Sequence, residues 1–449
     1  MSNQPTSDAA SALADLVKKA RIAGADAADA MLADSASLSV SYRLGTIESL
    51  ERAESVDLGL RVLVGKKQAI ASTTDKRPAA LDELVTRAIA MAMAAPEDEF
   101  CGLAPAELVA KSWPAIEIAD DGILDAARLT EAARVAEDAA RSIKGVTNSE
   151  GADANASAAE IMLVASNGFA GHYRRTHYSL SAAVLAGTGT GMERDHEYAT
   201  RVFVHDMPDA ATIGRSAGER AVKRLNARKM PTAHVPVVFD PRISGSMLGH
   251  LAGAISGASV ARGTSFLKDK LGQKIFPDTV TIIDDPHRTR GLRARPFDGE
   301  GLLPQKRKIV ENGVLTTWLL DLRSARQLKM QSTAHASRAP GSLHSPSPSN
   351  LYLEPGKQSP AELIGGIKQG FYVTELMGMG VNNVTGDYSR AAAGFWIENG
   401  MIAFPVNEMT IAGNLKDIFL RLTAAADLEF RYGVDAPTLL VEGMTVAGL

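Results

Sequence analysis

A zinc peptidase site is the first chemistry to test against the histidines of this sequence. Such a site on a helix needs two histidines on one face, in HExxH or HExxxH spacing, with the glutamate acting as general base. His250 ends the segment GSMLGH, which lies in a predicted helix, and could be the second histidine of an HExxxH arrangement. Gly245 and Ser246 stand where the first histidine and the glutamate would be. The segment therefore keeps one metal-ligand position and lacks the general base.

Other catalytic motifs are also incomplete. His196-Glu197 is followed by Thr200-Arg201 at the positions that would complete either spacing. No GxSxG motif is present, and Cys101 has no nearby base or strong helix start to lower its pKa. Asp284-Asp285 could bind a cation, but such a pair more often closes a turn. We find no self-sufficient catalytic constellation in the sequence.

Composition narrows the class of protein. The chain has 449 residues, of which 45% are hydrophobic and 22% charged, as in a globular protein of two or three domains. A net charge of -4 and a pI near 6.2 argue against direct contact with nucleic acid. The single cysteine excludes an intrachain disulfide and fits a reducing compartment. With no secretory signal recognisable in the first residues, we expect a cytoplasmic protein.

A glycine-rich helix is the element around which we expect the site to form. Val235 to Phe239 predict a strand, and Asp240-Pro241 predicts a helix start. In this helix the glycines fall four residues apart, at Gly245, Gly249, Gly253 and Gly257. Four interior glycines should cost about 4 kcal/mol relative to alanine, which a close approach of another backbone could offset. A transmembrane helix is disfavoured because glycine, serine and His250 leave few strongly apolar side chains.

The order of the predicted elements indicates an α+β protein with two domains. The N-terminal domain, 1–231, should contain a helix to about Ala23, a β-meander over 36–74 and further helices over 79–94, 125–142 and 208–225, with a subdivision near 96–120. Strands are expected between the last two helices. The C-terminal domain, 232–449, should be rich in antiparallel sheet. Two hairpins are predicted there at 308–320 and 395–406, because Glu-Asn-Gly joins two apolar runs in each.

Two irregular stretches interrupt the C-terminal domain. Residues 330–350 are rich in serine and proline and predict a loop that is either a functional lid or simply exposed. Ser359 to Glu362 form a capping box, so a helix should run to about Gly370. The glycine-rich run 377–395 has no nucleotide-binding motif and is expected to form turns and close packing.

Four segments carry a family resemblance. They are MERDHEYA at 192–199, GHLAGAISGASVARGTSFLKDKLGQKIFPD at 249–278, VTELMGMGVNNVTGDYSRAAAGFWIENG at 373–400 and PVNEMTIAGNLKDIF at 405–419. Together, and over nearly the full length, the chain resembles the PmbA/TldE family, also called modulator of DNA gyrase. The resemblance implies a two-domain TldD/PmbA-like fold. It also implies a heterodimeric metalloprotease that degrades or trims unfolded and ribosomally made peptides, with an HExxxH zinc site in its TldD-type subunit.

Within that family the chain is similar to the subunit that lacks the zinc site. It departs from the TldD pattern at 245–250, and its C-terminal segment 431–449 contains no cysteine. The resemblance therefore implies no cofactor in this chain, zinc in a TldD-like partner, and a homodimer in isolation as an alternative to the heterodimer. An active homodimeric metallopeptidase and a non-enzymatic adaptor that modulates gyrase indirectly remain alternative functions. No membrane contact is expected.

The residues expected to meet a peptide fall in three groups. An enzyme that accepts many unfolded sequences should grip backbone, and small residues admit a close backbone. The alternative is that these positions only build the core and a dimer interface. The candidates are Gly249, His250, Gly253, Gly257 and Arg262 in and after the helix, His335 and Arg338 in the loop, and Asp387, Tyr388, Ser389 and Arg390 in the glycine-rich run. Arg338 and Arg390 could pair with a peptide carboxylate.

Overall fold

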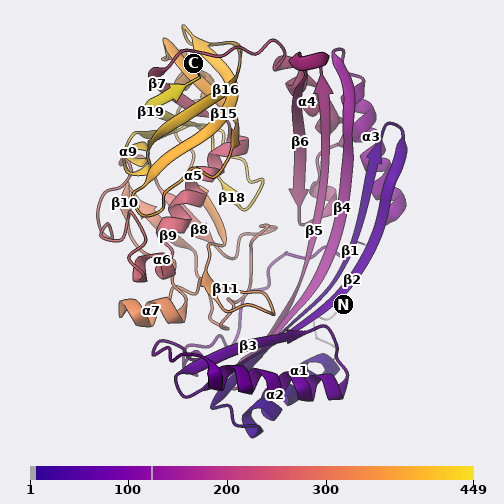
Figure 1. Ribbon diagram of the computed structural model, residues 1–449, viewed down its shortest axis with the longest axis vertical. Helices are drawn as coiled ribbons and strands as arrows, with labels where there is room; N and C mark the ends of the chain where they lie inside the picture. Colours follow the sequence, from indigo (N-terminus) through magenta and orange to yellow (C-terminus); the bar gives the residue numbers. More distant parts are fainter. Residues whose placement is uncertain (1–6, 123–124, 449) are drawn as a thin grey trace.

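The computed structural model describes residues 7–122 and 125–448, and it confirms the α+β class (Figure 1). One antiparallel sheet, in the order β3-β2-β1-β4-β5-β6, collects all strands that precede residue 202. Its strands are β1 (Ala27–Arg43), β2 (Thr46–Val64), β3 (Lys67–Thr73), β4 (Val146–Ala165), β5 (Ala170–Ala186) and β6 (Glu193–Arg201). The predicted meander is confirmed, with turns at Leu44-Gly45 and Gly65-Lys66.

Helices cover one face of this sheet. They are α1 (Ser7–Ile22), α2 (Pro78–Ala94), α3 (Ala126–Arg141) and α4 (Ala210–Lys223). Successive side chains of a strand point to opposite faces, so the even-numbered residues of β1 share one face. Ala28 and Ala30 belong to the core beneath α1 and α2, and Tyr42 belongs to the core beneath α3 and α4. Odd-numbered Asp29 and Met31 contact the C-terminal domain on the opposite face.

The C-terminal domain contains two larger sheets and one small one. The first has the order β16-β15-β14-β7-β19-β17, and an additional pairing of β16 with β19 closes five of these strands into a barrel. The others are β10-β9-β8-β13-β18 and the two-stranded β11-β12. The bounds are β7 (Ala233–Phe239), β8 (Ile282–Asp285), β9 (Arg307–Glu311), β10 (Val314–Leu315), β11 (Ala336–Ser337), β12 (Ser345–Pro346), β13 (Asn350–Leu353), β14 (Gln369–Met377), β15 (Asp387–Glu398), β16 (Met401–Asn414), β17 (Leu422–Ala424), β18 (Val434–Asp435) and β19 (Leu439–Ala447).

Both predicted hairpins are present, β9-β10 and β15-β16. Their turns place Asn312-Gly313 and Asn399-Gly400 at positive φ, the conformation that Asn-Gly favours in a tight hairpin. The helices of this domain are α5 (Pro241–Ala254), α6 (Gly257–Ala261), α7 (Leu322–Leu328), α8 (Pro360–Gly365) and α9 (Leu415–Leu420). The Ser359-Glu362 capping box is confirmed, although α8 ends five residues earlier than predicted, at Gly365 rather than Gly370.

The prediction of one continuous glycine-striped helix was wrong. The helix ends at Ala254 and a second, short helix begins at Gly257. Between them Leu319 donates its N–H to the carbonyl of Ile255 at 3.0 Å and accepts from the N–H of Gly257 at 2.8 Å. These hydrogen bonds to Leu319 take the place of hydrogen bonds within a helix. Gly257 therefore starts α6 and does not continue the row of glycines on α5.

The predicted loop 330–350 is not an exposed segment throughout. It forms β11 and β12 and packs against the N-terminal sheet, where a Cβ atom on Gly59 would stand 1.6 Å from the carbonyl oxygen of Pro340. Its His335 and His344 side chains are buried. The loop thus joins the two halves of the molecule. Within the part of the chain that the structure describes, no helix has both the length and the apolar character to cross a membrane.

Candidate functional site

Helix α5 is the element on which the candidate site is built. Buried strand β7 leads into it, and the Asp240 side chain caps its first turn by accepting from the N–H of Arg242 at 2.9 Å. The hydroxyl of Tyr372, on neighbouring β14, donates to the second Asp240 oxygen at 2.7 Å. Pro241 occupies the first helical turn, where its missing N–H has no cost. The start of α5 is therefore fixed to the barrel.

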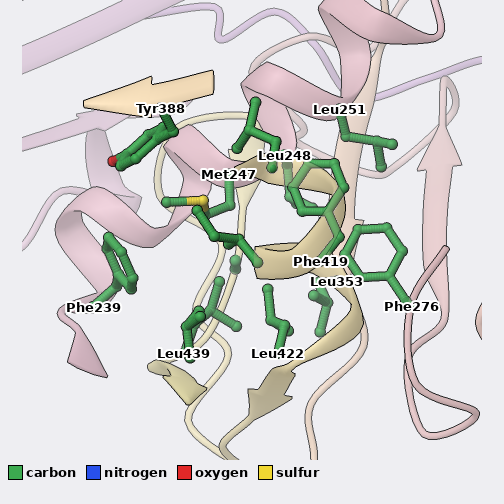
Figure 2. Packing of buried hydrophobic residues seen from close by; sticks show 14 of the residues in the cluster. Phe239, Met247, Leu248, Leu251, Phe276, Leu353, Tyr388, Phe419, Leu422 and Leu439 are labelled. Atoms are coloured by element: carbon green, nitrogen blue, oxygen red, sulfur yellow. The ribbon is translucent and has the colours of Figure 1, made fainter. Parts of the chain in front are cut away.

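The two sides of α5 differ in their surroundings. Met247, Leu248 and Leu251 are buried in the main core of the C-terminal domain, as Figure 2 shows. On the other side Gly249 and Gly253 are exposed, and a Cβ atom on either would meet nothing within 4 Å. No other part of the described chain approaches these two glycines closely, so the predicted close contact there could come only from a separate backbone such as an extended peptide.

Close approach does occur at the other two glycines. A Cβ on Gly245 would stand 2.6 Å from the carbonyl oxygen of Val434, and one on Gly257 would stand 2.5 Å from Leu320 Cδ2. Both distances are shorter than carbon atoms tolerate, so these positions require glycine in the present packing. The stripe thus combines two packing glycines with two that expose the backbone of α5.

Of the buried polar atoms that have no hydrogen-bond partner among the described residues, three lie on or beside α5: Ser246 Oγ, His250 Nε2 and Tyr388 Oη. Ser246 and His250 are four residues apart on α5 and so share one face. The Tyr388 ring, on β15, packs edge-on against the His250 ring at a centroid distance of 5.7 Å. In Figure 2, Tyr388 lies at the margin of the hydrophobic cluster, near Met247. Unpartnered buried polar atoms are costly, about 1–3 kcal/mol each, so a water or a ligand is expected to bond them.

The electrostatics of this face keep His250 neutral. Burial, together with the positive charge of Arg390, lowers the pKa of His250 to about 4. Burial also raises the pKa of the Tyr388 hydroxyl, against a smaller opposing effect of Arg390. At neutral pH the imidazole is therefore uncharged, with one nitrogen that donates and one that accepts. His250 and Tyr388 therefore offer hydrogen bonds without charge, beside the positive charge of Arg390.

The residues of α5 do not fit the HExxxH zinc site of the TldD-type subunit. The first histidine position of HExxxH is Gly245, where any side chain would collide with Val434. Ser246 stands at the glutamate position and has no carboxylate to act as base. Among residues 7–122 and 125–448, no group of three His, Cys, Asp or Glu side chains is arranged to hold a metal ion. His250 is the only ligand type of that motif on α5, and one imidazole cannot hold zinc tightly.

Of the predicted site residues, the structure brings together those of α5 and the first part of β15. His250, Tyr388 and Arg390 are neighbours, and Arg390 donates from Nε to the Met377 carbonyl at 3.1 Å. Asp387 and Ser389 are exposed beside them. Arg262 is exposed after α6, whereas Gly257 is buried.

The two loop candidates lie elsewhere and are engaged within the molecule. Arg338 is fully buried, and its Nη1 donates to Asp29 Oδ1 at 2.6 Å. It therefore holds the loop on the N-terminal sheet and is not free for a peptide carboxylate as predicted. His335 is buried between Thr333 and Asp284, at 2.8 and 3.2 Å. Asp284 lies in β8, and its carboxylate also accepts from Ser349; of the predicted Asp284-Asp285 turn pair, only Asp285 bonds the turn, by accepting from the N–H of His287 at 3.2 Å.

Ser246 is the site residue that sequence reasoning did not single out. Its spacing of four residues from His250 was a usable signal, because that spacing places both side chains on one helical face. Tyr388 was selected for its glycine-rich surroundings, although what distinguishes it is a buried hydroxyl against the His250 ring.

Comparison with known proteins identifies the class of protein to which this chain belongs. Three family models match the chain, described as PmbA/TldA metallopeptidase domain 1 (residues 28–92), central domain (119–225) and C-terminal domain (232–448). The chain therefore belongs to the PmbA/TldA metallopeptidase family.

Individual relatives agree with this assignment. The chain is 37% identical to Metalloprotease PmbA of Escherichia coli O157:H7, over 94% of this chain and 92% of that protein. It is also 37% identical to a Metalloprotease PmbA homolog of Haemophilus influenzae, over 92% and 90%. A Bacteroides thetaiotaomicron crystal structure, named as a candidate modulator of DNA gyrase, superposes with a TM-score of 0.91 and 28% identity, covering 99% of this chain and all of the other. TldE from Thermococcus kodakarensis shares the fold, with a TM-score of 0.87 over 97% of this chain and 100% of its own, at 20% identity.

Proposed function

We propose that this chain is the non-catalytic subunit of a zinc metallopeptidase that degrades or trims unfolded and ribosomally made peptides. A TldD-like chain would supply the zinc and the general base, and this chain would form one wall of the substrate channel. The observation that carries the proposal is the composition of α5, where Gly245 and Ser246 replace the histidine and glutamate of HExxxH and the packing at Gly245 leaves no room for a side chain.

The exposed face of α5 supports a role in holding peptide backbone. Gly249 and Gly253 leave the helix surface open, so an extended peptide can approach without meeting side chains. Ser246, His250 and Tyr388 hold buried polar atoms without partners among the described residues beside it, and a peptide group, which has both a donor and an acceptor, would bond them if these side chains turned toward it. A neutral His250 suits this task, because it bonds backbone without selecting for charge.

A second function, an active homodimeric metallopeptidase, is favoured by one observation only. Relatives at 37% identity carry the name Metalloprotease PmbA. Under that alternative the isolated chain would bind zinc through residues outside the α5 motif. The gyrase-modulator name of a structural relative supports the third alternative, an adaptor without enzymatic partner.

Co-purification with metal analysis tests the proposal. A tagged copy of this chain, expressed with its TldD-like candidate partner, should retain that partner in equimolar amount, with one zinc per pair. The chain purified alone should contain less than about a tenth of one zinc per chain, because its single imidazole is a weak ligand. One zinc per chain in the isolated protein would support the homodimeric enzyme, and absence of the partner from a zinc-free preparation would support the adaptor.

A further inference from the structure

A cavity lies between the end of β6 and the C-terminal domain, away from the exposed face of α5. It has a volume of about 290 Å³ and is lined by Thr200, Arg201, Asp206, the 288–292 segment, Asn350, Phe430, Arg431, Gly433 and Asp435. Gly433 and Asp435 line it, while Val434 between them directs its carbonyl to Gly245 of α5. The 433–435 segment therefore contacts both the cavity and the start of α5.

Guanidinium groups dominate the lining of this cavity. Four arginines contribute to it, and two of them are neutralised: Arg290 pairs with Glu117 and Asp206, and Arg431 pairs with Glu429. Arg201 and Arg288 have no carboxylate at salt-bridge distance among residues 7–122 and 125–448. Arg201 donates from Nη1 to the Thr200 carbonyl at 2.7 Å. The Arg288 guanidinium lies over the Phe430 ring, 3.4 Å from its centroid.

The carboxylates nearby are already occupied. Asp435 accepts from the backbone N–H groups of Arg431, Tyr432 and Gly433 at 2.8–3.0 Å, and Asp206 accepts from Arg290. Partial burial lowers the pKa of Arg288, although the more distant charges of Asp435 and Asp285 oppose this effect. Two partly buried cations thus retain donors with no carboxylate of the described residues at salt-bridge distance, and these donors are available to an anion that enters the cavity.

The apolar part of the lining restricts the chemistry of that anion. Phe430 and Leu292 form a wall beside the guanidinium groups, so a ligand with both a carboxylate and an aliphatic or aromatic portion matches the cavity better than a bare ion. The volume is comparable with one or two amino-acid residues. A planar carboxylate also suits the fork of donors that a guanidinium presents.

We propose that this cavity binds the terminal carboxylate of a peptide through Arg201 and Arg288, with the last side chain against Phe430 and Leu292. The inference rests on the proposed function, because it assumes that the chain handles peptides. It adds an anchoring point that recognises a free chain end. Peptides that end in a carboxylate would be held on the far side of the 433–435 segment from α5.

The test uses the full chain without a partner and measures binding alone. Fluorescence anisotropy compares an N-terminally labelled unfolded peptide that ends in a carboxylate with the same peptide as its C-terminal amide. The free acid should bind at least about tenfold more tightly, as expected for loss of a charge-assisted bidentate contact. The Arg201→Gln/Arg288→Gln double variant should bind acid and amide equally. Arg215→Gln, which removes an exposed arginine of α4 outside the cavity, should behave as wild type.

Further arms keep the result decisive. Thermal unfolding establishes whether each variant folds. If the double variant is unstable, Arg288→Lys replaces it in the test; this substitution keeps the charge but loses the fork of donors, so it should weaken binding of the free acid. Equal binding of acid and amide by the wild type, or undiminished discrimination by the folded variants, would overturn the proposal. If inorganic phosphate displaces the labelled peptide and the protein does not discriminate between acid and amide, the cavity is a phosphate site and the proposal is also overturned. Zinc content and partner retention are measured separately, so failure here leaves the subunit assignment unaffected.

Discussion

The carbonyl oxygen of Val434 lies 2.6 Å from the point where a Cβ atom would stand on Gly245, so this end of α5 has no room for a histidine. The same helix exposes Gly249, where a Cβ atom would meet nothing within 4 Å. Two glycines one helical turn apart therefore serve different purposes.

Alanine substitutions at these two glycines should change stability in opposite directions. Gly245→Ala should lower the free energy of unfolding, because overpacking costs roughly 1–3 kcal/mol and exceeds the helix-propensity gain of about 1 kcal/mol. Gly249→Ala should raise it by about 0.5–1 kcal/mol, because alanine favours the helix and nothing opposes its methyl group. Denaturant unfolding of both variants measures the difference. Stabilisation by Gly245→Ala would contradict the packing argument at the histidine position.

A bulky residue on the open face should impair peptide cleavage without preventing folding. Gly253→Leu places a side chain in space that is empty in the isolated chain, so its melting temperature should stay close to that of the wild type. Cleavage of an unfolded peptide by the reconstituted pair should fall by about tenfold or more if backbone contact there is worth at least 1.4 kcal/mol. Gly365→Leu, at an equally open glycine of α8, is the matched control and should cleave normally. Normal cleavage by Gly253→Leu would remove α5 from the channel.

Asp29 should be a large contributor to stability, because it lies between the buried Arg61 and Arg338 side chains. Asp29→Asn leaves two buried cations without their anion and should cost about 3–5 kcal/mol at neutral pH. Asp82→Asn, which breaks the exposed pair with Lys19, should change stability by no more than about 1 kcal/mol. If the two substitutions lower the free energy of unfolding in urea by equal amounts, Asp29 is not a large contributor to stability.

The Asp29 contribution should also depend on pH. Burial alone would raise the pKa of Asp29, but Arg338, Arg61 and His344 hold it well below its ordinary value of 3.8. A carboxylate with a depressed folded-state pKa stabilises the fold above its unfolded pKa, and that contribution is lost as the pH falls. The difference between wild type and Asp29→Asn should therefore be constant above about pH 5 and shrink below about pH 4.

His250 predicts a second pH dependence, at higher pH. Its folded-state pKa of about 4 lies below the ordinary 6.5, so the unfolded chain binds more protons between these values. His250 alone should therefore lower the wild-type free energy of unfolding by about 1 kcal/mol per pH unit as the pH drops from 6.5 toward 4. His250→Gln should remove this component, and the two proteins should have parallel profiles above pH 7. An unchanged slope in the variant would show that His250 is not buried as a neutral group.

Local sequence signals predicted much of the fold, because turns and helix starts are decided by a few neighbouring residues. The Asn-Gly hairpins at 312–313 and 399–400, the cap at Asp240 and the Ser359 capping box all formed where their chemistry required. The break after Ala254 could not be predicted, because it depends on hydrogen bonds with Leu319, some sixty residues away in sequence.

Long-range contacts also decided the candidate site. Arg338 lies in a serine- and proline-rich segment that carries no local sign of burial, yet its partner Asp29 is in the first strand. Arg201 and Arg288 have no carboxylate at salt-bridge distance among the described residues, because Glu117 pairs with Arg290 and Glu429 pairs with Arg431. Spacing along the chain does not reveal which arginine each glutamate pairs with. His250 and Tyr388 were both selected, but their ring contact required the packing of β15 against α5.

Peptide cleavage by separate and combined chains tests the central claim most directly. A fluorogenic unfolded peptide is given to this chain alone, to its TldD-like candidate partner alone and to an equimolar mixture, each supplied with zinc. We predict cleavage by the mixture at a rate at least about tenfold above the sum of the separate chains, with none above background from this chain alone. Zinc-dependent cleavage by this chain alone, at a rate comparable with the mixture, would contradict the account.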